Sequence, residues 1–202
     1  MDRLLVATTN KGKQREYQEL LGDLGICLTW PDAIGIVLDV PETGSSYLEN
    51  ARLKAAAYAA ASGLWTLADD SGLEVDALGG GPGVRSARYG EPGYTDEQRY
   101  RLLLSRMEHV RQWSQRTARF RCVIALVSPA GDCRWTEGVC EGMITFRPRG
   151  SYGFGYDPVF YLPDLDQTMA ELPPEIKNRL SHRARAAAAM RRLLREEILP
   201  HG

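Results

Sequence analysis

Two adjacent aspartates are the residues of this chain best suited to metal or acid–base chemistry. Asp69 and Asp70 follow the apolar run Leu64 to Ala68, which predicts a buried strand that ends in two carboxylates. Buried carboxylates need partners, and Mg²⁺ typically takes one or two of them together with phosphate oxygens from a substrate. An ordinary Asp-Ser-Gly turn through Ser71 is the simpler explanation of the same residues when they are taken alone.

A stretch near the N-terminus suits the binding of an anion such as phosphate. An apolar run over residues 4–8 predicts a strand, and the apolar spacing that follows predicts a helix over 13–24. A turn from strand to helix directs backbone N–H groups and the positive end of the helix dipole to one place, which favours phosphate. The spacing is not the GxxxxGK(S/T) of a P-loop, which disfavours a kinase or GTPase, and a plain turn with surface lysines explains the stretch about equally well. The residues concerned are Thr8, Thr9, Asn10, Lys11, Gly12 and Lys13.

Four other places offer side chains whose role their local pattern does not decide. Glu42 is a loop carboxylate and Lys54 lies on a predicted helix, and both residue types usually face solvent. Residues 151–158 place aromatic rings on a glycine-rich backbone, which suits stacking on a planar base or packing in a core. His182 and Arg183 begin the predicted last helix, whose arginines are most simply a solvated face. Each signal is weak by itself, and their order along the chain carries more information.

The elements that must position these residues alternate between strand and helix before a hairpin appears. Ser46-x-x-Glu49 and Thr95-x-x-Gln98 are capping boxes that each predict the start of a helix, and Gly63 predicts the end of the first. This order predicts an α/β protein with a mixed sheet, built as one domain or as two lobes that share the sheet. The predicted strands cover about 4–8, 65–69, 73–77, 120–128, 133–144 and 159–162, with short extended pieces at 27–30 and 34–38, and the predicted helices cover about 13–24, 46–61, 95–109 and 181–198.

The composition is that of an ordinary folded protein and gives no global signal for a partner. The chain has 202 residues, of which 44% are hydrophobic and 25% charged, and a net charge of −1. This charge does not favour nucleic acid or an anionic membrane as a partner. The four cysteines show no CxxC pair and no metal-site spacing, which indicates reduced thiols. No apolar run approaches membrane-spanning length and no signal sequence opens the chain, so we expect a soluble, cytoplasmic protein.

Taken in order, the candidate motifs strongly resemble those of the Ham1 family, the inosine triphosphate or dITP/XTP pyrophosphatases. The resemblance runs from Thr8 to about Ala189, and several of the motifs are long and specific. The motifs are Thr8-x-Asn10-x-x-Lys13-x-x-Glu16, Glu42-Thr43-Gly44-x-Ser46-Tyr47-x-Glu49-Asn50-Ala51, Asp69-Asp70-Ser71-Gly72-Leu73, Gly80-x-Pro82-Gly83, Ser86-Ala87-Arg88-Tyr89, Phe154-Gly155-Tyr156-Asp157-Pro158 and Ser181-His182-Arg183-Ala184.

The resemblance implies both a fold and an activity. The implied fold is two α/β lobes around a long central mixed sheet flanked by helices, with an active-site cleft between the lobes. Residues 1–202 would then form a single domain that pairs as a homodimer. The implied activity is the hydrolysis of non-canonical purine nucleoside triphosphates (ITP, dITP and XTP) to the monophosphate and pyrophosphate. Water would attack the α-phosphorus with the help of Mg²⁺, and the reaction would remove these nucleotides from the nucleotide pool.

Carried over position by position, the resemblance implies a role for each candidate residue. Glu42 and Asp70 would bind Mg²⁺, which neutralises the phosphates and lowers the pKa of a bound water. Asp70 would also take the proton from the attacking water, while Asp69 assists or orients it. Lys13 and Lys54 would stabilise the leaving pyrophosphate. The triphosphate would be held by Thr8, Thr9, Asn10, Lys11, Gly12 and Lys13, and the substrate would also be contacted by Ser71, Phe154, Gly155, Tyr156, Asp157, Lys177, His182 and Arg183.

Selectivity for the base is expected to depend on the six-position of the purine. A 6-keto base presents an acceptor there and an N1–H donor, whereas adenine reverses both, so donors near His182 and Arg183 would reject adenine by about 10⁴-fold. Phe154 is the residue expected to stack on the base. Two departures from the family pattern, Arg85 and Tyr89-Gly90-Glu91-Pro92, bear on the dimer contact or the loop shape rather than on the chemistry.

Three other functions stay open on the sequence. A related pyrophosphatase of the septum-inhibitor type would act on modified pyrimidine triphosphates, which the Ser-His-Arg and Phe-Gly-Tyr-Asp-Pro segments disfavour. A nucleotide sensor without turnover is disfavoured by the intact set of Lys13, Glu42, Asp69 and Asp70, because binding alone needs no proton acceptor. A nucleic-acid-binding protein is suggested only by the arginine-rich last helix.

Overall fold

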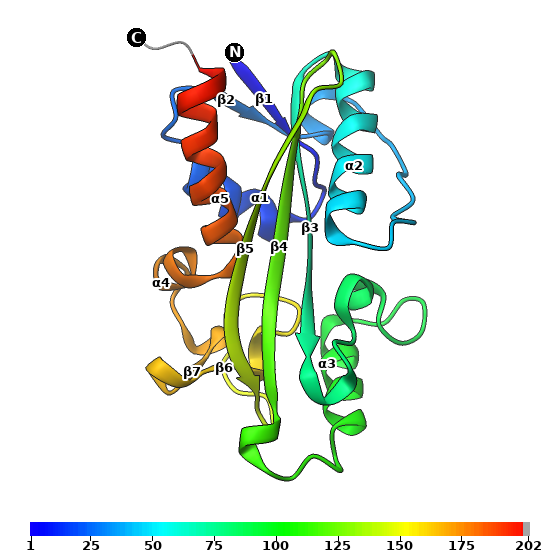
Figure 1. The fold of residues 1–202 in the computed structure, drawn as a ribbon, viewed down its shortest axis with the longest axis vertical. Helices are drawn as coiled ribbons and strands as arrows, with labels where there is room; N and C mark the ends of the chain where they lie inside the picture. Colours follow the sequence, from blue (N-terminus) through cyan, green and yellow to red (C-terminus); the bar gives the residue numbers. More distant parts are fainter. Residues whose placement is uncertain (200–202) are drawn as a thin grey trace. The chain divides into compact units, whose positions relative to one another are not determined.

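The fold is an open mixed sheet flanked by helices (Figure 1). Within residues 1–199, which are those that the computed structural model describes, the strands are β1 (Arg3–Val6), β2 (Cys27–Thr29), β3 (Trp65–Val75), β4 (Thr117–Val127), β5 (Cys133–Ile144), β6 (Phe160–Leu162) and β7 (Gln167–Thr168). Their order in the sheet is β2-β1-β3-β4-β5-β6-β7. β1 pairs in parallel with β2 and β3, whereas β6 pairs antiparallel with β5 and β7. The predicted α/β fold with a mixed sheet is confirmed.

Side-chain caps set where the first three α-helices begin. Asn10, Ser46 and Thr95 each use a side-chain oxygen to accept hydrogen bonds from backbone N–H groups of the first helical turn. Gly63 ends the second helix in the left-handed conformation, with φ of 67°, as the sequence predicts. In the described part of the chain the helices are α1 (Lys11–Leu21), α2 (Tyr47–Ser62), α3 (Asp96–Arg106), α4 (Pro174–Leu180) and α5 (His182–Leu193), which continues as a π-helical turn over Leu194–Ile198.

β3 is continuous where the sequence predicts a break. The predicted strands 65–69 and 73–77 are one strand of 11 residues. Asp69 and Asp70 lie within this strand, and their exposed fractions are only 3% and 6%. A turn at this point is therefore wrong, because both carboxylates find partners inside the protein and the extended backbone can continue.

Three smaller predictions are also corrected. α1 begins two residues earlier than predicted, because Asn10 supplies the cap. The predicted extended piece 34–38 is wrong, since a short 3-10 turn at Asp32–Ile34 leads into irregular backbone. α4 and β7 have no counterpart in the prediction because both are too short to show a period.

The chain divides into two compact units, and β3, β4 and β5 have residues in both. The described residues of unit 1 are 1–70, 122–138 and 182–199, and those of unit 2 are 71–121 and 139–181. Unit 1 contains β1, β2, α1, α2 and α5, and unit 2 contains α3, α4, β6 and β7.

The core of unit 1 has two parts, one on each face of its strands. Successive side chains of a strand point to opposite faces of the sheet. Leu67 therefore packs with residues of α1 and α5, including Tyr17 and Met190, whereas its neighbour Ala68 packs with Ala51 and other residues of α2. Figure 1 shows α1 and α5 on one side of β1 and β3 and α2 on the other. Asp69 and Asp70 continue this alternation.

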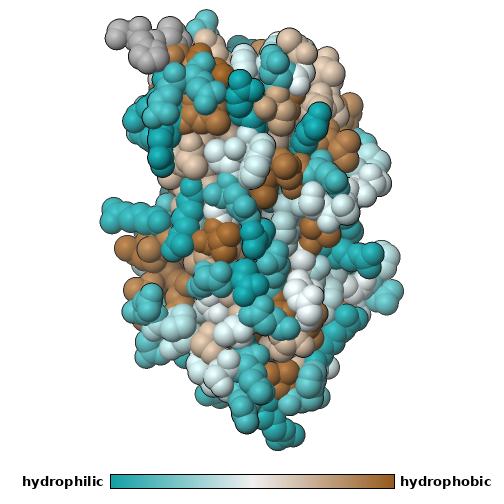
Figure 2. All heavy atoms as spheres, in the orientation of Figure 1, coloured by the Kyte–Doolittle hydropathy of each residue, from teal (hydrophilic) through white to brown (hydrophobic). Residues whose placement is uncertain are grey.

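Unit 2 has a core of its own. Leu73 and Val75 of β3 pack with Leu103 of α3 and Phe160 of β6. Figure 2 shows hydrophilic and hydrophobic side chains interspersed over the face drawn. Among residues 1–199, the helices are all too short or too polar to cross a membrane.

Candidate active site

Asp69 is the centre of a buried cluster of charges on the face of β3 that packs against α1 and α5. Lys13 Nζ lies 2.9 Å from Asp69 Oδ2, and Arg183 donates from Nε and Nη2 to the same oxygen, both at 3.3 Å. Arg183 Nη1 also donates to Glu16 Oε2 at 2.5 Å, and only 2% of Arg183 is exposed. These four residues, called the ion cluster below, contain two cations and two anions. Their charges therefore balance, as burial requires.

The surroundings of Asp69 suit it to hold other groups rather than to accept a proton. Burial alone would raise the pKa of Asp69, but Lys13, Arg183 and Lys54 outweigh it and keep the pKa well below the ordinary value. The Cys122 thiol also contacts Asp69 Oδ2, at 3.8 Å, and burial raises the pKa of Cys122 so that it stays protonated. Asp69 is therefore ionised at neutral pH and fixed by its partners.

Asp70 points to the opposite face, toward α2, and has a different hydrogen-bond partner. Asn50 Nδ2 donates to Asp70 Oδ2 at 2.9 Å. Burial, with a further contribution from the negative charge of Glu42, raises the pKa of Asp70 to about 6 although the Asn50 hydrogen bond lowers it. Glu42 forms an ion pair with Lys54. Glu42 and Asp70 are called the acidic pair below. Lys54 pairs with Glu42, and the positive charges of Lys54 and Lys13 both act to lower the pKa of Asp70.

Asn50 ties the loop that carries Glu42 to the helix beside Asp70. Its side chain is fully buried, and its Oδ1 accepts a hydrogen bond from the Gly44 N–H at 2.8 Å. A Cβ on Gly44 would lie 2.7 Å from this oxygen, so the close approach requires glycine. Glu49 holds the same loop, because its Oε2 accepts from the Ser45 N–H at 2.6 Å. One buried amide therefore positions both members of the acidic pair.

The acidic pair fits a hard divalent cation. Carboxylate oxygens are the ligands that Mg²⁺ prefers, and Mg²⁺ usually takes only one or two from the protein while water and phosphate supply the rest. In residues 1–199 no group of three or more histidines, cysteines or acidic residues is arranged to hold a metal ion. Two carboxylates are the number that Mg²⁺ usually takes from a protein when water and phosphate supply its other ligands.

The N-terminal segment separates its two lysines. The Asn10 side chain accepts from the N–H groups of Gly12 and Lys13 at 2.8 and 3.1 Å, so two of the N–H groups expected to meet phosphate already have a partner. Thr8 Oγ1 accepts from the Asn10 N–H at 3.2 Å, and Thr9 is exposed. Lys13 belongs to the ion cluster, whereas Lys11 lies on the surface and pairs with Asp32 at 2.7 Å. Of the two, only Lys13 meets the predicted site residues in unit 1.

In unit 2, Asp157 fixes the aromatic loop. This residue is 3% exposed, and its Oδ2 accepts from Lys177 Nζ at 2.6 Å and from the Phe154 N–H at 2.9 Å. Lys177 Nζ lies 4.6 Å from the centre of the Phe154 ring, and the ring remains half-buried. Tyr156 is buried, and its hydroxyl donates to the Ser86 carbonyl at 2.8 Å. The loop therefore combines one core aromatic residue with one that keeps an accessible surface.

The predicted site residues fall into groups within each unit. In unit 1 the structure brings together Lys13, Asp69 and Arg183, and separately Glu42, Lys54 and Asp70; in unit 2 it brings together Phe154, Asp157 and Lys177. His182 is buried at the start of α5 in unit 1, Ser71 is half-buried in β3 in unit 2, and the Gly155 N–H donates to Asp96 at 2.8 Å.

The sequence did not assign roles to two residues that the structure places at the centre of these groups. Glu16 lies three residues after Lys13 on α1, and Asn50 lies four residues before Lys54 on α2. Residues three or four apart share one face of a helix. This spacing is the signal that could have added both residues to the predicted site.

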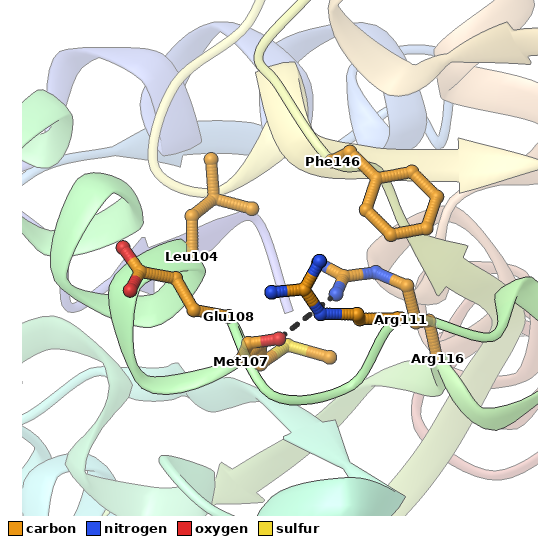
Figure 3. Close-up of a pocket in the computed structure, with 6 residues that line it drawn as sticks. All are labelled: Leu104, Met107, Glu108, Arg111, Arg116 and Phe146. Atoms are coloured by element: carbon orange, nitrogen blue, oxygen red, sulfur yellow. Dashed lines mark hydrogen bonds between the residues drawn. The ribbon is translucent and has the colours of Figure 1, made fainter.

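A pocket of about 500 Å³ in unit 2 contains none of the predicted site residues. Its lining is Leu104, Met107, Glu108, Arg111, Arg116 and Phe146 (Figure 3). Arg116 is buried, donates to the carbonyls of Met107, Val110, Ile144 and Thr145, and places its guanidinium 4.4 Å from the Phe146 ring centre. These bonds connect the chain after α3 to the end of β5, so Arg116 has a structural role there.

Known proteins resemble this chain over nearly its whole length. The chain is 49% identical over 195 residues to a dITP/XTP pyrophosphatase of Methylococcus capsulatus, covering 96% of each chain. It is 44% identical over 194 residues to a dITP/XTP pyrophosphatase of Bacillus subtilis, covering 96% of this chain and 98% of the relative. A solved Ham1 protein from Coxiella burnetii aligns with a TM-score of 0.88 and 43% identity over 96% of this chain and 98% of its own.

The family itself is also identified directly. The model of the Ham1 family matches residues 4–193, which is most of the sequence. A solved Ham1 protein from Staphylococcus aureus aligns with a TM-score of 0.83 and 38% identity over 95% of this chain and 97% of its own. The resemblance seen in the sequence motifs is confirmed, and the chain belongs to the Ham1 family.

Proposed function

We propose that this protein is a nucleoside triphosphate pyrophosphatase that hydrolyses non-canonical purine nucleotides, namely ITP, dITP and XTP, to the monophosphate and pyrophosphate. Relatives that are 44–49% identical over nearly the whole chain bear the name dITP/XTP pyrophosphatase. The observation that carries the proposal is the contrast at Asp69 and Asp70. One carboxylate is fixed as an anion among cations, and the next has a pKa of about 6 beside a second acid.

In this proposal Asp70 accepts the proton of the water that attacks the α-phosphorus. A general base works best when its pKa lies near the operating pH, which suits Asp70 far better than Asp69. Asn50 holds one oxygen of Asp70, and thereby orients the carboxylate. Asp69 keeps Lys13 in place, so that Lys13 and Lys54 provide positive charge for the departing pyrophosphate.

A divalent cation belongs to the same proposal. Glu42 and Asp70 would hold Mg²⁺, which when bound neutralises charge on the phosphate oxygens. Thr8, Thr9, Asn10 and Gly12 remain the proposed neighbours of the triphosphate. Homodimer formation and a cytoplasmic location are further parts of the proposal, and sedimentation would test the first.

For the base, we propose stacking on Phe154, whose position the Asp157–Lys177 pair supports. His182 and donors near it are the proposed partners of the 6-keto oxygen and exclude adenine, because a donor would otherwise face a donor. Arg183 is held between Glu16 and Asp69, which fits a positioning role better than direct contact with the base. Ser71, Gly155 and Tyr156 complete the proposed surroundings of the substrate.

The test is product analysis with several nucleotides. The protein would be incubated with Mg²⁺ and ITP, dITP, XTP, GTP, ATP or a modified pyrimidine triphosphate, and the products separated. We expect IMP and pyrophosphate from ITP, with little turnover of ATP or GTP. Release of orthophosphate would contradict the proposed bond cleavage. Binding of ITP without turnover would favour a sensor, and preference for the pyrimidine would favour the septum-inhibitor type.

A further inference from the structure

Lys54, which the proposed function assigns to the departing pyrophosphate, pairs in this structure with the carboxylate of Glu42. Its ammonium group forms an ion pair with Glu42 Oε1 and lies 3.4 Å from the Asp69 carbonyl oxygen. About a fifth of each partner's side chain is exposed, with values of 20% for Lys54 and 21% for Glu42. The pair is therefore largely shielded from water, where charge interactions are stronger than at an open surface.

Oxygen atoms of two segments hold the ammonium group of Lys54. Glu42 forms an ion pair with it, and the Asp69 carbonyl accepts a hydrogen bond from it. An ammonium group and a divalent cation on the same carboxylate lie only a few ångströms apart and repel each other, even when each contacts a different oxygen. Lys54 therefore weakens the binding of a metal ion at Glu42 unless the lysine moves to another anion.

From this arrangement we propose that Lys54 is an internal competitor for the divalent cation at Glu42, so that the protein binds metal weakly until a triphosphate draws the lysine away. The proposal rests on the metal role of Glu42 and Asp70 in the proposed function. A triphosphate supplies several anionic oxygens that can accept from Lys54. Its arrival would free Glu42, so metal and nucleotide would bind with positive coupling.

Lys13 provides the internal comparison for this proposal. It is also close to an aspartate, but in the ion cluster the two acids Glu16 and Asp69 balance the charges of Lys13 and Arg183. Lys54 instead pairs with Glu42 of the acidic pair and lies near the negative charges of Asp69 and Asp70. Removing the charge of Lys54 should therefore improve metal binding.

The experiment measures Mn²⁺ binding to the nucleotide-free protein by the electron paramagnetic resonance signal of free Mn²⁺. Lys54→Met removes the charge and keeps the length of the side chain, and we expect it to bind Mn²⁺ about tenfold more tightly than wild type, equal to about 1.4 kcal/mol. Lys54→Arg keeps the charge and should bind Mn²⁺ as weakly as wild type. The double variant Glu42→Gln with Lys54→Met should lose the gain, because the carboxylate that gained affinity is gone.

Two results would overturn the inference. One is a K54M variant that binds Mn²⁺ no more tightly than wild type. The other is a gain that persists when Glu42 is also changed, since the ion would then be bound elsewhere. Thermal unfolding in EDTA checks that each variant is folded, and K54Q serves as a second neutral variant if K54M is not. If the wild type hydrolyses ITP but K54M shows no gain in Mn²⁺ affinity, the proposed function stands and only this inference is removed. If the wild type does not hydrolyse ITP, the proposed function is removed, whatever the Mn²⁺ result.

Discussion

Asp69 and Asp70 are neighbours in one strand, yet the two faces of the sheet give them opposite properties. On the face of α1 and α5, Asp69 meets Lys13 and Arg183, and the ion cluster balances two cations against two anions. On the face of α2, Asp70 meets Asn50 and the second acid Glu42. Because the side chains of a strand alternate between its two faces, one dipeptide supplies both a carboxylate held by cations and the carboxylate that we propose as the proton acceptor.

The largest effect should come from neutralising the acceptor. Asp70→Asn keeps the shape of the side chain but cannot take a proton, so we expect kcat to fall by about 10³-fold while nucleotide binding stays detectable. Turnover and binding of ITP would be measured separately, the second by calorimetry in Ca²⁺. Asp69→Asn is the matched variant on the other face and should mainly lower stability. Turnover by D70N close to that of wild type would remove Asp70 from the acceptor role.

The next effect concerns the balance of the ion cluster. Glu16→Ala removes one of the two acids that hold Arg183, which leaves an excess of buried positive charge, and we expect a loss of about 3 kcal/mol in the free energy of unfolding. Urea denaturation would measure it. Glu97→Ala, which breaks an exposed pair with Arg101 on α3, is the control and should change little. Equal losses for the two variants would mean that burial does not distinguish the ion cluster from a surface pair.

The sequence predicted the parts of the fold that depend on local chemistry. The caps at Ser46 and Thr95, the stop at Gly63 and the neighbouring strands β4 and β5 follow from residues close together in the chain, and they are confirmed. The break in β3 was wrong because the local pattern cannot show Lys13 and Arg183, which come from distant segments and stabilise Asp69 in an extended strand.

The same reason limits what the sequence says about the site. Asn50 and Glu16 each stand inside a motif that carried the family resemblance, yet nothing local assigns them partners in another element. The family motif contains Lys13 and not Lys11, but the local sequence does not show their contacts: Lys13 pairs with Asp69 and Lys11 with Asp32. Residue types and spacing identify the motifs, whereas tertiary contacts decide which partner each residue of a motif binds.

The pKa values of the two aspartates are shifted in opposite directions, so their contributions to stability change with pH in opposite directions. Burial and Glu42 raise the pKa of Asp70 from 3.8 to about 6, so the folded protein binds this proton more tightly than the unfolded chain. The contribution of Asp70 to stability is full below its unfolded pKa of 3.8 and is lost as the pH rises through about 6. The unfolding free energy of wild type relative to D70N, measured in EDTA, should therefore fall by about 2–3 kcal/mol between pH 4 and pH 7.

The contribution of Asp69 to stability should change with pH in the opposite direction. Its pKa is lowered by Lys13 and Arg183 against the effect of burial, so its contribution is present above pH 3.8 and is lost as the pH falls toward its folded value. Wild type relative to D69N should accordingly lose stability at acid pH. If the difference in unfolding free energy between wild type and D70N does not change from pH 4 to pH 7, Asp70 is ionised throughout this range. Burial and Glu42 would then not raise its pKa.

The smallest effect is expected where the two lysines of the N-terminal segment differ. Lys11 pairs with Asp32 on the surface, so Lys11→Ala should change kcat/KM for ITP by less than about threefold. Lys13→Ala removes a cation from the ion cluster and from the proposed pyrophosphate site, and the loss of a charge-assisted bond predicts a fall of about tenfold to a hundredfold. Steady-state kinetics at two salt concentrations would separate a local contact from a general charge effect, since both variants change the net charge equally.

The two possible outcomes have different meanings for the N-terminal segment. If kcat/KM for ITP falls as far in K11A as in K13A at both salt concentrations, Lys11 leaves Asp32 when substrate binds. The whole segment from Thr8 to Lys13 then acts as one triphosphate site. If kcat/KM falls only in K13A, Lys13 is the lysine of this segment that acts on the substrate. Asp69 would then hold the lysine that binds phosphate, whereas Asp70 would take the proton.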